Sequence, residues 1–173
     1  MKNLKDTETK DRLDIITYGN PVLRKRAVEI KNITDEIKKI AEDMVSIMHS
    51  APGIGLAAPQ INKSIRLVTI DLSVGEKKED LIVLINPKIT HEEGQDTAEE
   101  GCLSVPGINE NVPRSFHLEC TGYDLTGKEK RIEAEGLLAR VISHEVDHIN
   151  GILFIDHLSP LKKSIIRKKL KKP

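Results

Sequence analysis

Aromatic residues and cysteines are scarce in this chain of 173 residues. It contains two Phe, two Tyr and no Trp, so we expect an aliphatic core. Base-stacking nucleic-acid modules, which depend on aromatic platforms, are disfavoured, and we expect no DNA partner. The two cysteines cannot cross-link a disulfide-rich scaffold. The length suits about one domain.

Long hydrophobic runs are also lacking. The first 14 residues are charged and contain no apolar stretch typical of a signal peptide, so we expect a cytoplasmic protein. One stretch, 44–62, lacks Asp, Glu, Lys and Arg. Its prolines, glycines and polar side chains exclude a membrane span, because lipid would leave their polar groups unpaired. We therefore expect no membrane partner.

There is no net charge, with 27 basic and 27 acidic side chains, but the charges are unevenly distributed. Residues 162–173 carry seven Lys or Arg and no acid, whereas the other 161 residues carry 20 basic and 27 acidic side chains. A basic tail on an acidic body suggests an anionic partner such as RNA or phosphate. A solvated terminal helix fits this pattern equally well.

The spacing of apolar residues predicts helices at both ends of the chain and strands between them. A helix is expected after Thr34, ending at 50–53, and a buried helix over 136–150. Ser159 and Pro160 suit the start of a last, basic helix. Strands are expected at 65–72, 81–86, 115–124 and 128–135. This order favours an α+β fold.

The strongest chemical signal is HEVDH at 144–148. On a helix, His144 and His148 lie one turn apart and can reach the same metal ion. Glu145 lies about 100° further round, where it can take a proton from a water on that metal. Two chance histidines on a solvated helix are the alternative. They would share a face with Leu137 and Val141, however, and imidazoles buried there need partners.

A metal that activates water usually has three protein ligands and an open position. Downstream of HEVDH, His157 is interpreted as a surface residue near the start of the basic helix. Upstream, Cys102 lies in EEGCLSVPG (99–107), interpreted as a loop that could offer a thiolate to an ion. Cys120 alternates with polar neighbours in a predicted strand and is interpreted as a core residue.

The charge-free stretch contains GIGLAAPQ at 53–60. Its glycines and alanines allow the backbone to approach a ligand closely. Gln60 ends the segment with an amide that can donate a hydrogen bond. No Lys follows at the spacing of a phosphate loop. Taken alone, the segment is more typical of a tight turn between a helix and a strand.

In this order, GIGLAAPQ, EGCLSVPG and HEVDH closely resemble the three motifs of the peptide deformylase family. The resemblance extends from about residue 13 to 160. It implies an α+β fold in which antiparallel strands pack around a central HExxH helix, with an N-terminal helix and a C-terminal basic helix. It also implies a flexible extension at 1–12, a catalytic domain at 13–160 and a basic helix or tail at 161–173.

The resemblance implies an enzyme that hydrolyses the N-formyl group of the initiator methionine of new proteins and releases formate. The family's metal ligands fall on Cys102, His144 and His148, with water as a fourth ligand. The expected ion is Fe²⁺, because the family is known for it. A thiolate with two imidazoles also suits Zn²⁺, Ni²⁺ or Co²⁺, any of which could replace iron in a purified sample.

The resemblance also assigns roles to the residues around the metal. Glu145 corresponds to the general base and acid, and Gln60 and the backbone N–H of Leu103 correspond to the donors that hold the oxyanion. Arg114 matches a family position near the site, where a salt bridge to an acid is expected. Substrate contacts, including an apolar pocket for methionine, are expected from Gly53, Ile54, Gly55, Gly101, Leu137 and Val141.

The expected partners are N-formyl-methionyl nascent peptides and the ribosome, the latter through residues 160–173. A zinc metallopeptidase of the HExxH type is the main alternative, but a suitable third ligand is missing downstream of the motif. A ribosome-binding module with a vestigial site is a second alternative, although all the expected ligands and the base are present. A structural zinc site would have four protein ligands and would leave Glu145 unexplained.

Overall fold

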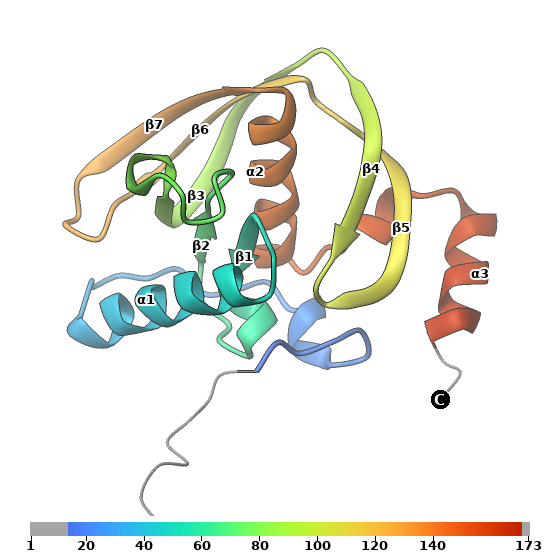
Figure 1. The fold of residues 1–173 in the computed structure, drawn as a ribbon, viewed down its shortest axis with the longest axis horizontal. Coiled ribbons are helices and arrows are strands. Elements are labelled where there is room, and N and C mark those ends of the chain that lie inside the picture. The colour runs from blue at the N-terminus through green and yellow to red at the C-terminus, as the bar shows by residue number, and fades with distance from the viewer. Residues whose placement is uncertain (1–13, 171–173) are drawn as a thin grey trace, which may run out of the picture.

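The computed structural model describes residues 14–170, and the expected extension at 1–12 and the last three residues of the tail lie outside this range. The helices and strands are α1 (Asp35–Ser50), β1 (Gly55–Ala57), β2 (Leu67–Ile70), β3 (Ile82–Glu93), β4 (Asp96–Cys102), β5 (Val105–Arg114), β6 (His117–Tyr123), β7 (Glu129–Glu135), α2 (Gly136–Ile149) and α3 (Pro160–Leu170). In Figure 1, α2 lies in the middle, with a sheet on one side and the β4–β5 hairpin on the other. The expected α+β fold is confirmed.

The main sheet has five antiparallel strands in the order β1-β2-β3-β6-β7. β4 and β5 form a separate two-stranded hairpin. β1 pairs only with β2, so its other side is an edge of the sheet. A strand edge leaves backbone N–H and C=O groups available for another extended chain.

The core lies between α2 and one face of the sheet. Ile142 and Ile149 of α2 pack in one cluster with Val68, Leu84 and Leu118 of the strands, and all five are buried. Full burial of an aliphatic side chain contributes about 1.5–3 kcal/mol. This contact fixes the helix that carries HEVDH against the sheet.

Local signals set the ends of the helices where the sequence predicts them. The Thr34 side chain accepts a hydrogen bond from the Ile37 N–H at 3.3 Å and caps α1. After α2, Gly151 adopts a φ of 77° and donates its N–H to the His148 carbonyl at 3.1 Å. Glycine adopts this left-handed conformation without the steric cost of a Cβ atom. Pro160 is the first residue of α3.

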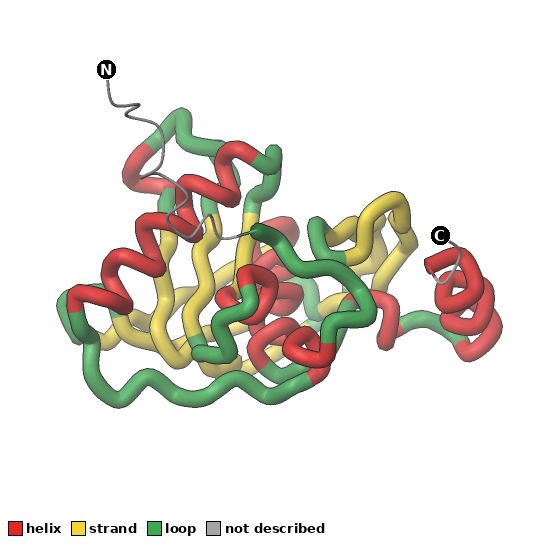
Figure 2. The backbone as a smooth tube through the Cα atoms, turned by 90° about the horizontal axis from the view of Figure 1, so that it is seen from below, coloured by secondary structure: helices red, strands yellow, loops and turns green. Residues whose placement is uncertain are grey.

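Two further clusters attach the outer helices. Met44 and Met48 of α1 are fully buried with Leu56 and Leu67, which join α1 to β1 and β2. At the other end of the molecule, Ile166 of α3 packs in a cluster with β5 and the segment after α2. Figure 2 shows α3 at this outer end, beside the hairpin. Among the described helices, none has the length and hydropathy required to cross a bilayer.

The sequence was wrong about two strand regions. β3 runs to Glu93, well beyond the strand expected at 81–86, and its last four residues are exposed. The β4–β5 hairpin was not predicted, because many of its side chains are polar. Its inward side chains, Val105, Ile108 and Val112, are spaced irregularly rather than at every second residue. Cys102 therefore ends a strand and does not lie in a free loop.

Candidate metal centre

The two histidines of HEVDH face each other on α2. Their Nε2 atoms are 3.2 Å apart and their ring centroids are 4.9 Å apart. His148 is almost fully buried. One helical turn between the two residues places both nitrogens beside a single point, as the sequence pattern predicts.

Cys102 reaches the same point from the hairpin. Its Sγ atom lies 3.3 Å from Nε2 of His148. One ligand atom from each of Cys102, His144 and His148 lies within 4.8 Å of the other two. Cys102 is the last residue of β4, so the hairpin brings the thiol to the helix.

This donor set fits a divalent transition metal. One sulfur and two imidazole nitrogens are the ligands that zinc, iron, cobalt and nickel accept in proteins. Three protein ligands also leave a coordination position for a reactant. The structure therefore brings together the three residues that the sequence motifs suggested as ligands, over separations of 42 and 46 positions.

Glu100 holds the ring of His144 from behind. Its Oε2 atom lies 3.0 Å from Nδ1 of His144, so that nitrogen donates and Nε2 keeps its lone pair for a metal. Arg114 donates two hydrogen bonds to the same carboxylate, at 2.9 and 3.0 Å, and Arg140 donates one at 2.8 Å. Burial opposes ionisation of Glu100, but hydrogen bonds from His144 and Arg114 outweigh it and lower its pKa to about 2.

Arg140 also joins the helix to the hairpin. Its guanidinium donates to the backbone carbonyls of Val112 at 2.8 Å and Asp96 at 2.9 Å. Arg140 belongs to α2, whereas the two carbonyls belong to β5 and β4. Neither Arg140 nor Glu100 was predicted from the sequence. The segment 99–107 was interpreted as a loop, where a spacing of two residues between Glu100 and Cys102 does not indicate a shared face.

Glu145 stands beside the two histidines and is buried, with 3% of its surface exposed. Its Oε2 atom has no hydrogen-bond partner among residues 14–170. Burial raises the pKa of Glu145 to about 7. A carboxyl group with this pKa can both take and give a proton near neutral pH.

The GIGLAAPQ segment forms β1 and a short 3₁₀ helix, Ala58–Ile61, in place of the simple turn that the sequence favoured. Gln60 is buried, and its Oε1 atom accepts a hydrogen bond from the Ala57 N–H at 2.9 Å. This contact fixes the amide, so Nε2 points to Ser104 Oγ at 3.2 Å and Cys102 Sγ at 3.6 Å. The donor end of Gln60 thus faces Cys102, one of the three candidate ligands.

A pocket of about 460 Å³ opens beside these residues. One part of its wall is formed by Gln60, Cys102, His144 and Glu145. The expected oxyanion donor Leu103 also lines it, as do all the residues expected to contact substrate, namely Gly53, Ile54, Gly55, Gly101, Leu137 and Val141. Leu137 is 55% exposed and therefore lies on an open part of this wall.

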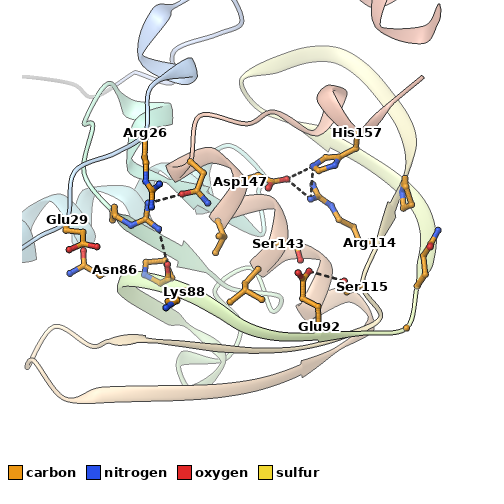
Figure 3. Close-up of a pocket in the computed structure, with 18 residues that line it drawn as sticks. Arg26, Glu29, Asn86, Lys88, Glu92, Arg114, Ser115, Ser143, Asp147 and His157 are labelled. Atoms are coloured by element: carbon orange, nitrogen blue, oxygen red, sulfur yellow. Dashed lines mark hydrogen bonds and ion pairs between the residues drawn. The ribbon is translucent and has the colours of Figure 1, made fainter. Parts of the chain in front are cut away.

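A larger pocket, of about 760 Å³, borders a different face of α2 and contains none of the three candidate ligands. Figure 3 shows Arg114 and His157 directed towards Asp147 in its wall. Arg114 donates to Asp147 at 2.5 Å, and His157 Nε2 lies 2.7 Å from the same carboxylate. Arg114 thus makes the expected salt bridges, and His157 is exposed, as expected for a surface residue.

Comparison with known proteins gives a consistent result. The family model described as polypeptide deformylase matches residues 12–164. A peptide deformylase of Thermodesulfovibrio yellowstonii is 48% identical over 159 residues, which cover 92% of this chain and 96% of that protein. The crystal structure of a peptide deformylase from Legionella pneumophila is 39% identical, with a TM-score of 0.85, and the match covers 92% of this chain and 98% of that one.

A second solved structure, a peptide deformylase from Synechococcus elongatus in complex with actinonin, is 40% identical with a TM-score of 0.88. The match covers 95% of this chain and 91% of that one. The family model, the sequence relatives and the solved structures all name the same family over nearly the whole chain. The chain belongs to the polypeptide deformylase family.

Proposed function

We propose that this chain removes the N-formyl group from the initiator methionine of newly synthesised proteins by metal-dependent hydrolysis. The observation that carries the proposal is the convergence of Cys102, His144 and His148 within 4.8 Å, with the buried Glu145 next to His144 in the chain. In this proposal the three residues are the metal ligands. When bound, the divalent ion acts as a Lewis acid and lowers the pKa of a water from about 15.7 towards about 7.

Glu145 moves the proton in the proposed reaction. It accepts the proton from the attacking water and later passes it to the leaving amine, so the C–N bond breaks and formate is released. Its buried carboxyl, whose Oε2 atom has no hydrogen-bond partner among residues 14–170, is free for both transfers. Gln60 Nε2 and the Leu103 N–H donate hydrogen bonds to the oxygen that becomes negative during attack. Loss of one such donor costs about 3–4 kcal/mol of barrier.

The substrate's methionine side chain enters the apolar part of the 460 Å³ pocket, between Ile54, Leu137 and Val141. The open edge of β1 supports an extended position for the peptide, because backbone groups near Gly55 can pair with it. Gly53 and Gly101 also line this pocket.

Fe²⁺ is the proposed physiological ion, and Zn²⁺, Ni²⁺ or Co²⁺ are the ions expected to replace it in a purified sample. The thiolate and two imidazoles support all four. The proposed place of action is the cytoplasm, on chains that leave the ribosome. Binding to the ribosome is assigned to residues 160–173, because α3 presents Arg167 and Lys168 to solvent.

An HExxH zinc peptidase is not favoured, because the third candidate ligand is a cysteine from the hairpin. The test is an anaerobic assay of formate release from a formyl-Met peptide, with metal content measured on the same sample. We expect formate in proportion to bound metal, with no cleavage of acetylated peptides at internal bonds. Absence of formate release from the fully metal-loaded protein would refute the proposal.

A further inference from the structure

We propose a second metal site, for a divalent transition metal ion such as Zn²⁺. It is formed by His91, Glu93 and His117 at one end of the main sheet. One ligand atom from each of these residues lies within 4.8 Å of the other two. The rings of His91 and His117 meet edge to face, with centroids 6.2 Å apart. Two imidazoles and one carboxylate form a donor set that suits zinc, copper, nickel and cobalt.

The strands hold the three residues on one face. His91 and Glu93 are two positions apart in β3, and side chains at that spacing point the same way. His117 of β6 stands directly opposite Glu93 in the register of the two strands. Directly opposed side chains on antiparallel strands have Cβ atoms about 5 Å apart. The backbone therefore sets the site, although His91 and Glu93 themselves are exposed.

The tautomer of His117 also favours a metal. Its Nε2 atom lies 3.1 Å from Oε1 of Glu133 on β7. A carboxylate can only accept, so Nε2 carries the hydrogen, and in the neutral ring Nδ1 then carries the lone pair. That Nδ1 atom is buried and has no hydrogen-bond partner within the described part of the chain. A carboxylate on one ring nitrogen and a metal on the other is the usual arrangement for a histidine ligand.

The surrounding charge supports a cation at this end of the sheet. Glu135 stands opposite His117 in the β6–β7 register. Glu133 is two positions before it in β7 and therefore lies on the same face. The nearby Arg131 already forms an ion pair with Glu119. An added divalent cation would thus meet an excess of carboxylates.

The site is separate from the candidate catalytic centre. Glu135 is followed by Gly136, the first residue of α2, and His144 lies eight residues further along that helix. At about 1.5 Å per residue, Gly136 and His144 are roughly 12 Å apart along the helix axis. An ion here would join β3 to β6 at the point where the chain leaves β3 for β4, the strand that carries Cys102.

The test uses enzyme loaded with Ni²⁺ and then equilibrated by dialysis with micromolar Zn²⁺, with both metals counted. We expect one more metal per chain in the wild type than in His91→Ala or His117→Ala. Replacement of Ni²⁺ by Zn²⁺ at the catalytic centre does not disturb this comparison, because the total metal is counted. Formate release should be the same in all three proteins.

Glu133→Gln tests the contact between His117 Nε2 and Glu133, because it removes a carboxylate that does not itself bind the ion. We expect weaker Zn²⁺ binding at this site by about 10–100-fold. Glu129→Gln, an exposed glutamate at the other end of β7, is the matched control and should bind Zn²⁺ as the wild type does. Equal metal counts in the wild type and both histidine variants would overturn the proposal.

Discussion

Glu100 Oε2 lies 3.0 Å from Nδ1 of His144, and this contact joins the β4–β5 hairpin to α2 beside the candidate metal ligands. The same carboxylate accepts from Arg114 and Arg140, so one buried anion holds three cationic or polar groups. The contact orients His144 before any metal arrives. Its removal should therefore affect metal affinity more than the fold of the sheet.

Glu100→Gln should reduce metal affinity by about 10–100-fold, because the amide holds the His144 ring less firmly and loses the charge that balances the arginines. Metal content after dialysis against a chelator series would measure this. Glu99→Gln is the matched control, because Glu99 is exposed and precedes Glu100 directly. Equal metal retention in both variants would contradict the role given to Glu100.

Glu145→Gln should retain the metal and lose turnover. The amide keeps the size of the side chain but cannot take the proton from water, and general-base groups contribute typically about 10²–10⁴-fold to rates. Formate release and metal content should be measured on the same preparation. The proposed proton carrier would have to be another group if the variant kept activity within tenfold of the wild type.

Gly55→Ala should impair catalysis because β1 lies against Glu145. A Cβ atom at position 55 would clash with Oε1 of Glu145 and approach Cγ1 of Val141 to 2.9 Å. Something in the catalytic wall must shift, and we expect a loss of at least about tenfold in kcat/KM, because small displacements of reacting groups are costly.

Gly53→Ala is the matched comparison for that variant. Its Cβ atom would meet the end of the flexible Leu103 side chain at 3.1 Å, which can move aside. We expect a smaller loss of kcat/KM, with normal metal content in both variants. If Gly53→Ala lowered kcat/KM more than Gly55→Ala, the close packing of β1 on Glu145 would not explain why residue 55 is glycine.

Cys120 should be chemically inert in the native chain. It is fully buried, and burial raises the pKa of its thiol from 9.0 to about 11. Iodoacetamide at pH 8 should label Cys120 only after denaturation, because the thiolate is the reactive form. Native labelling of Cys120 at the rate of a free thiol would contradict this assignment.

The same thiol makes stability depend on pH. Because its pKa is higher in the folded chain, its contribution is complete below pH 9 and is lost as pH rises from about 9 to 11. The free energy of unfolding of the wild type should therefore fall by up to about 2 kcal/mol more than that of Cys120→Ala over this interval. Denaturant titrations at both pH values would measure the difference.

The sequence predicted the parts of the site that depend on local geometry. The pair His144 and His148 needed only the helical period, and the helix itself was marked by buried apolar positions and ends where Gly151 follows. The caps at Thr34 and Pro160 were equally local. These features require no knowledge of distant contacts.

The hairpin depended on tertiary contacts and was missed. Its polar strands gain order from groups outside them, above all from Arg140, which donates to a carbonyl of each strand. Nothing in the local sequence of 96–114 identifies that partner. For the same reason the sequence placed Cys102 in a loop, although the structure shows it at the end of a strand.

The basic helix α3 gives the last prediction. Lys162 is already bound to Glu110 at 2.6 Å, whereas Arg167 and Lys168 are exposed. Reversing these two charges to Glu should weaken salt-dependent ribosome binding, and each lost phosphate contact should reduce the slope of log affinity against log salt by roughly one. Ile166, which packs α3 onto the core, stays in place, so release of formate from a free peptide should not change. Lys77→Glu with Lys78→Glu, two exposed residues far along the chain from α3, is the control. Ribosome binding that is equally strong in the α3 variant and the control would exclude this helix as the contact.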